Sequence, residues 1–289
     1  MDISPDIKGF LVTRRARLTP EEVGLPPGRR RRVPGLRREE VAQLAGVSLE
    51  YYTQIERGKV SGVSAEVLDA VAAALRLSEA ERAHLFDLVR VGSTKTGRRS
   101  PGPRAAVALP EGVRELLDAL VGAGAVVITG HLDVVAANAL GRALYAPVFD
   151  RAVGTPNLAR TVFLDPGADA VFPDWGCAAD DVVALLRVEA ARHPDAPAII
   201  TLIGELATRS EPFRTRWAAH NVKAHHHGVK RFRHHIVGEM TLTYNAFELP
   251  GAEGLSLIGY TAPPGSPAEQ SLRLLASWVA TEQREIVVE

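Results

Sequence analysis

The stretch EEVAQLAGVSLEYYTQIERG, residues 39–58, has the residue pattern of two short helices joined by a tight turn. Such a turn favours a glycine where the backbone adopts positive φ, and Gly46 stands at that point. Two closely crossing helices need a small residue, which Ala42 supplies, and Ser48 can cap the second helix. We expect the apolar seam between the helices to consist of Val41, Leu44, Val47, Tyr52 and Ile55. Together these features predict a DNA-reading helix-turn-helix in preference to a purely structural helical hairpin.

The register of the motif predicts which side chains meet DNA. On the second helix Gln54 could pair with adenine, and Glu50 could accept a hydrogen bond from cytosine. The predicted base-facing residues are Arg38, Leu49, Glu50, Thr53 and Gln54, and the predicted phosphate contacts are Ser48, Tyr51 and Arg57. One such module reads DNA weakly, so we expect a homodimer on an inverted-repeat site in double-stranded DNA.

A run of four basic residues precedes the motif. It consists of Arg29, Arg30, Arg31 and Arg32 and is bounded by proline and glycine. Such a run is either a solvated charged segment or an arm that contacts phosphates or the minor groove, and the sequence leaves both interpretations open.

The net charge of zero averages two unlike parts of the chain. Residues 1–100 hold 18 Lys+Arg against 13 Asp+Glu, a net of +5, which leaves 16 against 21 and a net of −5 in the remainder. This asymmetry suggests a basic module that meets a polyanion and an acidic module that does not. The lone Cys177, the lack of a secretory signal pattern and the lack of a long apolar run predict a cytoplasmic protein without membrane contact.

The segment VGSTKTGRRSPGPR, residues 91–104, is rich in glycine, proline and basic residues, as a linker is. We therefore expect a helical DNA-binding domain over residues 1–90, a linker over 91–105 and a second domain over 106–289. In the second domain, two short strands in AVVITGHLDVVAAN precede several helices between residues 137 and 222. Three extended segments follow, at residues 228–237, 239–249 and 255–262, and Met240, Leu242 and Tyr244 alternate with polar residues as in a half-buried strand. The order predicts an α+β domain with one five-stranded antiparallel sheet and helices on one face.

No catalytic motif stands in the second domain, so we expect neither an enzyme nor a cofactor; an enzyme that carries a DNA-binding domain is the less favoured alternative. The histidines are the other alternative, because imidazoles bind zinc, copper or nickel. Those that lie close together are His225, His226, His227, His234 and His235. Three adjacent histidines on a strand cannot all face one ion, so we predict no metal site, and a metal-responsive regulator stays the second hypothesis.

The motif resembles the xenobiotic-response-element, Cro/repressor-like class of helix-turn-helix proteins over residues 7–90, including the closing IERG. A larger resemblance, to the MmyB-like actinobacterial regulators, covers nearly the whole chain. It rests on LRREEVAQLAGVSLEYYTQIERG, NLARTVFLDP, FPDW, GVKRFRH, VGEMTLTY and YTAPPGSPAE. The resemblance implies that the second domain is PAS-like and receives a small apolar ligand, with fatty acids the suspected class. It also implies a ligand-responsive transcription regulator.

A ligand cavity is mostly apolar and carries a few polar anchors. The candidate ligand-binding residues are Asn138, Trp175, Trp217, His220, Arg231, Arg233 and Tyr244. Each has a structural alternative. Asn138 could cap the helix that follows it, the tryptophans could belong to the core, and the arginines could be surface charge.

Overall fold

The structure, a computed structural model, describes residues 3–26, 31, 33, 35–93, 109–222, 227–252 and 254–288. The chain forms two compact units. The first comprises Met1–Pro103, Arg187–Ile200 and Thr215–Ala224, and the second comprises Arg104–Leu186, Thr201–Arg214 and His225–Glu289. Most of the predicted linker, residues 94–105, lies outside the described residues. No helix in the described ranges is both long enough and apolar enough to cross a membrane.

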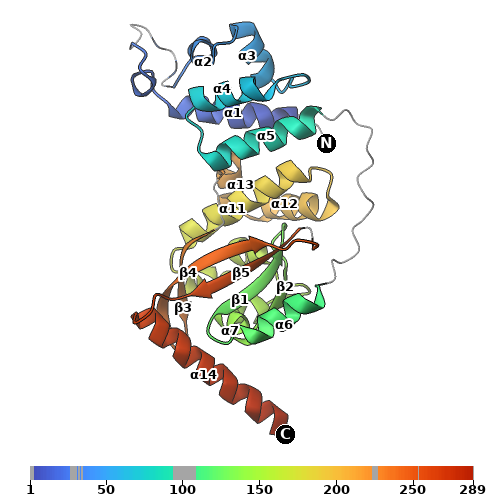
Figure 1. Cartoon of the computed structure of the whole chain (residues 1–289), viewed down its shortest axis with the longest axis vertical. Helices are drawn as coiled ribbons and strands as arrows, with labels where there is room; N and C mark the ends of the chain where they lie inside the picture. Colours follow the sequence, from blue (N-terminus) through green and yellow to red (C-terminus); the bar gives the residue numbers. More distant parts are fainter. Residues whose placement is uncertain are drawn as a thin grey trace. The chain divides into compact units, whose positions relative to one another are not determined.

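The first unit begins with the predicted series of short helices (Figure 1). They are α1 (Ser4–Arg17), the single 3₁₀ turn η1 (Glu21–Val23), α2 (Arg38–Leu44), α3 (Leu49–Glu56), α4 (Ala65–Ala74) and α5 (Glu79–Ser93). Reciprocal capping hydrogen bonds stand at the start of two of them. Ser78 and Glu81 bond to each other's backbone N–H at the start of α5, and Thr19 and Glu22 do so before η1.

The helix-turn-helix has its predicted geometry, with one correction. Gly46 adopts φ +66°, and the Ser48 Oγ accepts a hydrogen bond from the Tyr51 N–H at 3.0 Å. In the seam, the side chains of Val41, Tyr52 and Ile55 are fully buried. The prediction for Leu44 is wrong: its side chain is 36% exposed, because α2 ends there and the buried position falls to Ala45.

The second unit contains the predicted five-stranded antiparallel sheet (Figure 1). Its strands are β1 (Gly124–Thr129), β2 (Val134–Ala137), β3 (His227–His234), β4 (Gly238–Glu248) and β5 (Leu255–Thr261), in the spatial order β2-β1-β5-β4-β3. Every neighbouring pair is antiparallel. In β4 the side chains of Met240, Leu242 and Tyr244 are buried and those of Thr241 and Asn245 are exposed, which confirms the predicted alternation.

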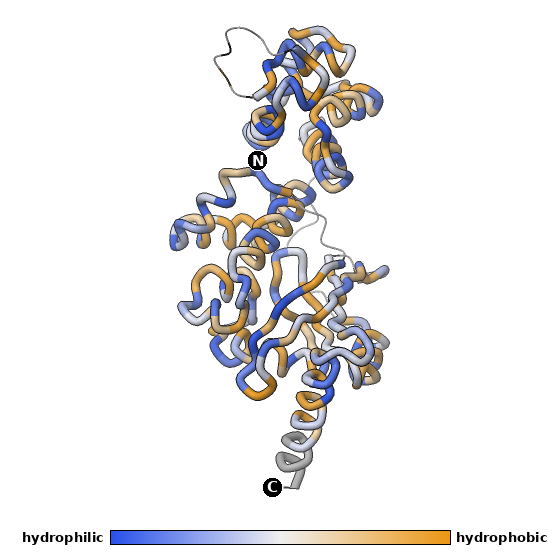
Figure 2. Tube along the Cα trace, turned by 90° about the vertical axis from the view of Figure 1, so that its left-hand side faces the viewer, coloured by the Kyte–Doolittle hydropathy of each residue, from blue (hydrophilic) through white to orange (hydrophobic). Residues whose placement is uncertain are grey.

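Helices lie on both faces of the sheet, which corrects the prediction of a single covered face. Helix α6 (Glu111–Ala119) packs through Leu117 against the face formed by Ala125, Val127 and Leu257. The opposite face meets α7 (Ala139–Leu144), α9 (Leu158–Leu164), α10 (Ala168–Val171) and the start of α11 (Trp175–Arg192). Figure 2 shows hydrophobic and hydrophilic residues alternating in bands along the helices, as expected when one side of each helix is buried.

The described part of the chain also contains the helices α8 (Ala146–Asp150), α12 (Pro197–Arg209), α13 (Glu211–Ala218) and α14 (Pro267–Val288). Helix α14, which the sequence analysis did not predict, packs against β4 and α7 through the buried Leu272 and Leu275. Helices α11, α12 and α13 each contribute residues to both compact units. In α11 the division falls between Leu186 and Arg187.

Candidate DNA-binding surface and ligand cavity

Helix α3 presents much of the predicted reading surface to solvent. Leu49 is 48% exposed and Tyr51 is 37% exposed, and Glu50 and Arg57 are also exposed. Ser48 is exposed but uses its hydroxyl oxygen to cap α3. The exposed side chains therefore include a carboxylate, a guanidinium and an aromatic ring. Groups of these kinds can contact nucleobases or phosphates.

Two of the predicted base-facing residues are half-buried. The Thr53 hydroxyl donates a hydrogen bond to the Leu49 carbonyl at 2.7 Å, so it is used within the helix. The Gln54 Oε1 is buried and has no hydrogen-bond partner in the described part of the chain. A Gln that reads adenine uses both amide atoms, so the Gln54 side chain must rotate before it can do so.

The buried carboxylate of Glu56 ties α3 to the two helices beside it. It accepts from Arg15 Nε of α1 at 2.9 Å and from Arg38 Nε of α2 at 2.6 Å, and it is 1% exposed. The position of Arg38 in the motif predicts a base contact. The structure gives Arg38 this ion pair while leaving 44% of its side chain exposed.

The basic run before α2 is described only at Arg31. Its guanidinium forms two hydrogen bonds with Glu40, at 2.6 and 2.9 Å, and one with the Gly35 carbonyl at 2.6 Å. Arg31 thus links the segment before α2, at Gly35, to Glu40 in the first turn of α2. The other members, Arg29, Arg30 and Arg32, lie outside the described residues.

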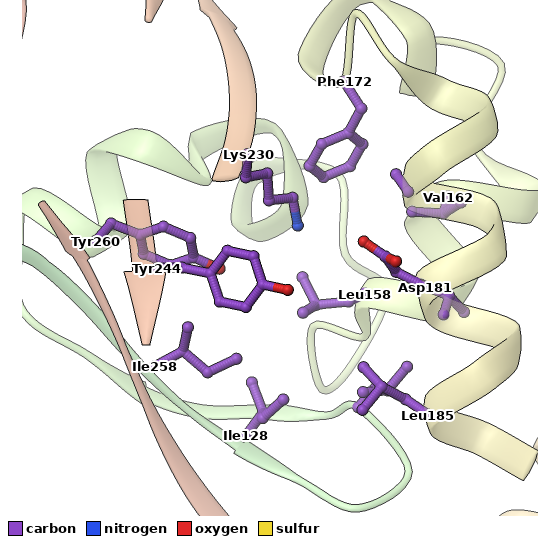
Figure 3. A pocket seen from close by; sticks show the side chains of 13 residues that line it. Ile128, Leu158, Val162, Phe172, Asp181, Leu185, Lys230, Tyr244, Ile258 and Tyr260 are labelled. Carbon is purple, nitrogen blue, oxygen red and sulfur yellow. The ribbon is translucent and has the colours of Figure 1, made fainter. Parts of the chain in front are cut away.

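A cavity lies between the inner face of the sheet and the helices α9–α11 in the second unit (Figure 3). Most of its wall is aliphatic or aromatic. The lining residues are Ile128, Leu132, Leu158, Val162, Phe172, Ala178, Asp181, Val182, Leu185, Lys230, Tyr244, Ile258 and Tyr260. Its volume of about 30 Å³ holds a water molecule or two, well below the roughly 300–1,000 Å³ of typical ligand pockets. This conformation is therefore nearly closed.

Lys230 places an amine in this apolar space. Its Nζ donates a hydrogen bond to the Tyr145 hydroxyl at 3.1 Å and lies 4.8 Å from the ring centroid of Phe172 and 5.6 Å from that of Phe232. Aromatic faces attract a cation but replace only part of its lost hydration. Burial accordingly lowers the pKa of Lys230 to about 8, although the carboxylate of Asp181 opposes this shift.

Polar groups gather around Lys230 at one side of the cavity. Figure 3 shows the Asp181 carboxylate and the Tyr244 hydroxyl pointing toward the same space as the amine, with Ile128, Ile258 and Leu185 on the other side. Burial and the negative charge of Asp181 raise the pKa of Tyr244 to about 12. Behind Lys230 the hydroxyls of Tyr145 and Tyr260 are 2.6 Å apart. The cavity thus has an apolar side and a polar side that carries both charges.

The structure brings only one of the predicted ligand-binding residues, Tyr244, to the cavity wall. Arg231 and Arg233 project from the outer face of β3, 45% and 53% exposed, and pair with Asp174 and Glu239. Because side chains alternate along a strand, their neighbour Lys230 faces inward.

The remaining predicted ligand contacts have structural roles. Asn138 is buried and caps α7 through its side-chain oxygen. Trp175 donates from Nε1 to the Val162 carbonyl at 2.8 Å and packs edge-on against Phe163. In the first unit, the Cζ of Arg187 lies over the ring of Trp217, 4.1 Å from the ring centroid. The Nδ1 of His220 lies 3.0 Å from the Nη1 of Arg187.

Sequence reasoning missed Lys230 and Asp181. The signal for Lys230 was present, because Lys230 and Phe232 share one face of β3 while the flanking arginines share the other. Asp181 follows Asp180 in the sequence, and only the rotation of α11 turns the second carboxylate inward. No local pattern distinguishes the two.

A second hollow in the same unit is larger and more open. It has a volume of about 430 Å³ and is lined partly by Arg151, Arg160 and Arg209. These arginines already pair with Asp165 and Glu205. Such a polar groove suits an apolar ligand less well than the enclosed cavity.

The histidine cluster does not converge in the described part of the chain. His227 is exposed at the start of β3, whereas His234 is buried at its end and stacks on His235, with ring centroids 4.6 Å apart. Within the described ranges no three His, Cys, Asp or Glu side chains form a group that could hold a metal ion. His225 and His226 lie outside those ranges.

Two family models match the chain. A model described as the MmyB-like transcription regulator ligand binding domain matches residues 109–275, and one described as a helix-turn-helix domain matches residues 13–85. None of the curated proteins matches the chain. The larger match spans more than half of the 289 residues. The protein is a DNA-binding transcription regulator with a ligand-binding domain, and it belongs to the MmyB-like family.

Proposed function

We propose that this regulator senses a small apolar or fatty-acid-like acyl ligand, and that the ligand changes its affinity for an operator. The observation that carries the proposal is the cavity, whose wall is apolar except for Lys230, Asp181 and the tyrosine hydroxyls. An amphiphile matches such a wall because its chain faces the aliphatic side chains and its head group meets the amine.

The buried amine also argues for a ligand role. Burying a charged lysine costs free energy, and the Tyr145 hydroxyl and aromatic rings around Nζ recover only part of it. A methionine of similar length would avoid that cost. Retention of such a group is expected where it serves binding.

Ligand entry requires the cavity walls to separate, because about 30 Å³ cannot hold an acyl chain. Helix α11 supplies Ala178, Asp181, Val182 and Leu185 to the wall. From Arg187 onward the same helix belongs to the compact unit that includes α3. A displacement of α11 by the ligand would therefore reach the DNA-reading unit through the helix itself, and DNA affinity would change by the difference in ligand affinity between the two states.

For the DNA side, we propose that a cytoplasmic homodimer reads an inverted repeat. Leu49, Glu50, Gln54 and Arg38 would contact bases, whereas Ser48, Tyr51, Arg57 and the remaining arginines of the basic run, Arg29, Arg30 and Arg32, would contact phosphates. The exposure of Leu49, Glu50, Tyr51 and Arg57 supports this assignment. The strand order of the second unit is consistent with a PAS-like sensor, and the proposed role requires no enzymatic step.

The experiment that tests the sensing role is mass spectrometry of protein purified without an affinity tag and then denatured. A co-purified acyl compound, lost from a Leu158→Trp variant that fills the cavity, would support the proposal. A second experiment measures the affinity of the protein for operator DNA by fluorescence anisotropy, with and without that compound. A compound that binds but leaves DNA affinity unchanged would refute the sensing role, and metal found by elemental analysis would favour the metal-responsive alternative.

A further inference from the structure

The polar side of the cavity carries one group of each charge. Lys230 approaches from β3 and Asp181 from α11, and Figure 3 shows both side chains directed at the space that a ligand head group would occupy. Asp181 supplies a carboxyl group and Lys230 an amine, and the two groups carry opposite charges when both are ionised. The two charges together leave this end of the cavity close to neutral.

A free fatty-acid carboxylate fits this arrangement poorly. It would gain from the ammonium of Lys230 but would bring a second negative charge beside Asp181, in a space enclosed by Phe172, Leu158 and Ile258. Like charges repel strongly where water is excluded, and a carboxylate offers Asp181 no hydrogen to accept. One of the two acids would have to take up a proton before the site could close.

A neutral head group that both accepts and donates hydrogen bonds fits without that penalty. Its carbonyl oxygen would accept from Lys230 Nζ, and its N–H or O–H would donate to the Asp181 carboxylate. The hydroxyl of Tyr244 stands beside both groups and can serve either role. The net charge of the cavity would not change.

We infer that the cavity selects acyl compounds with an uncharged head group that pairs a carbonyl with a hydrogen-bond donor, such as a fatty amide or a hydroxylated acyl ester, over free fatty acids. The inference rests on the proposed acyl-sensing function and identifies its ligand class. The apolar side, formed by Ile128, Ile258 and Leu185, accepts the chain in either case, so the head group alone decides the preference.

The test compares octanamide with octanoic acid, which share the same chain length, by isothermal titration calorimetry on the full-length protein at pH 7. We expect octanamide to bind at least about tenfold more tightly to the wild type. Asp181→Asn keeps the side-chain shape and removes the charge, and should bring octanoic acid to equal or tighter binding than octanamide. The matched control is Asp180→Asn, because Asp180 is the exposed neighbour on the same helix and should leave the wild-type order unchanged.

The outcomes distinguish failure of this inference from failure of the proposed acyl sensing. Tighter binding of octanoic acid by the wild type would overturn the inference while supporting acyl sensing. Equal binding of the two compounds by the wild type would overturn it as well, and this comparison needs no variant to fold. Binding of neither compound would refute acyl sensing itself, and the head-group preference with it.

Discussion

The Nε of Arg38, at the start of α2, lies 2.6 Å from Oε1 of Glu56, at the end of α3. Glu56 is 1% exposed and also pairs with Arg15, so one buried carboxylate fixes the recognition helix relative to α1 and α2. In the proposed complex, the angle at which α3 meets DNA would therefore depend on a residue that does not itself face DNA.

Glu56→Ala should destabilise the first unit strongly, because it removes the buried carboxylate that pairs with both Arg38 and the nearly buried Arg15. We expect a loss of roughly 3–5 kcal/mol in the free energy of unfolding, measured by denaturant titration followed by circular dichroism. Glu39→Ala is the control, since its ion pair with Arg37 is solvent-exposed and should contribute less than about 1 kcal/mol. Equal effects of the two substitutions would contradict the structural role of Glu56.

Gln54→Ala should weaken binding to the true operator by about 1–3 kcal/mol and relax specificity at one base pair. Glu50→Ala should relax specificity at a different position, because its exposed carboxylate accepts only from a base donor such as cytosine N4. The measurement is fluorescence anisotropy over a panel of single-base operator variants. Specificity that survives both substitutions would show that α3 is not the reading helix.

Arg57→Ala should act differently from the base-facing substitutions. A phosphate contact contributes equally on all sequences, so the variant should weaken specific and nonspecific DNA alike and lower the slope of log affinity against log salt by about 1. Titrations over a range of salt concentrations measure this slope. A change of sequence preference without a change of slope would show that Arg57 contacts a base and not a phosphate.

Local residue patterns predicted the parts of the fold that depend on short-range backbone geometry. The φ of Gly46, the cap at Ser48 and the alternation along β4 follow from neighbouring residues alone. The exposure of Leu44 and the packing of α6 on the second face depend on how elements that are distant in the sequence pack together. A short segment of sequence holds no information about that packing. The cavity is a product of such docking, so Asp181 could not be separated from Asp180 before the rotation of α11 was known.

Asn138 illustrates how a residue predicted for ligand binding can be fully used by the fold. Its side chain accepts from the N–H groups of Ala125 and Gly141 and donates to the carbonyls of Leu120 and Ala123, all within 2.6–2.8 Å. Gly141 allows this close approach, since a Cβ there would lie 2.2 Å from the Ala125 oxygen.

Asn138→Ala should therefore reduce the free energy of unfolding of the second unit by about 3 kcal/mol or more, because buried backbone groups lose their partners. The control is Ser266→Ala in the same unit, where a cap of α14 is removed at a cost of about 1 kcal/mol. Thermal unfolding followed by circular dichroism compares the two. A smaller loss for Asn138→Ala than for Ser266→Ala would contradict the assigned role.

Lys230→Met should stabilise the ligand-free protein while it weakens acyl ligand binding. The pKa of Lys230 is lowered from 10.5 to about 8, which corresponds to a cost of up to about 3 kcal/mol for holding the charged form in the cavity at neutral pH. The free energy of unfolding should rise by up to that amount in denaturant titrations. Arg231→Met, on the exposed face of the same strand, should change it by less than about 1 kcal/mol.

The same lysine predicts a pH dependence with a definite sign. Because the folded-state pKa of about 8 is below the unfolded value of 10.5, the unfolded chain binds more protons between these pH values. The destabilisation is therefore complete below pH 8, fades as the pH rises and disappears above about 10.5. The stability advantage of Lys230→Met over the wild type should shrink across this window in unfolding experiments at pH 7, 9 and 10. An advantage that stays constant with pH would mean that burial does not shift the pKa of Lys230, and an advantage that grows with pH would mean that its pKa is raised instead of lowered.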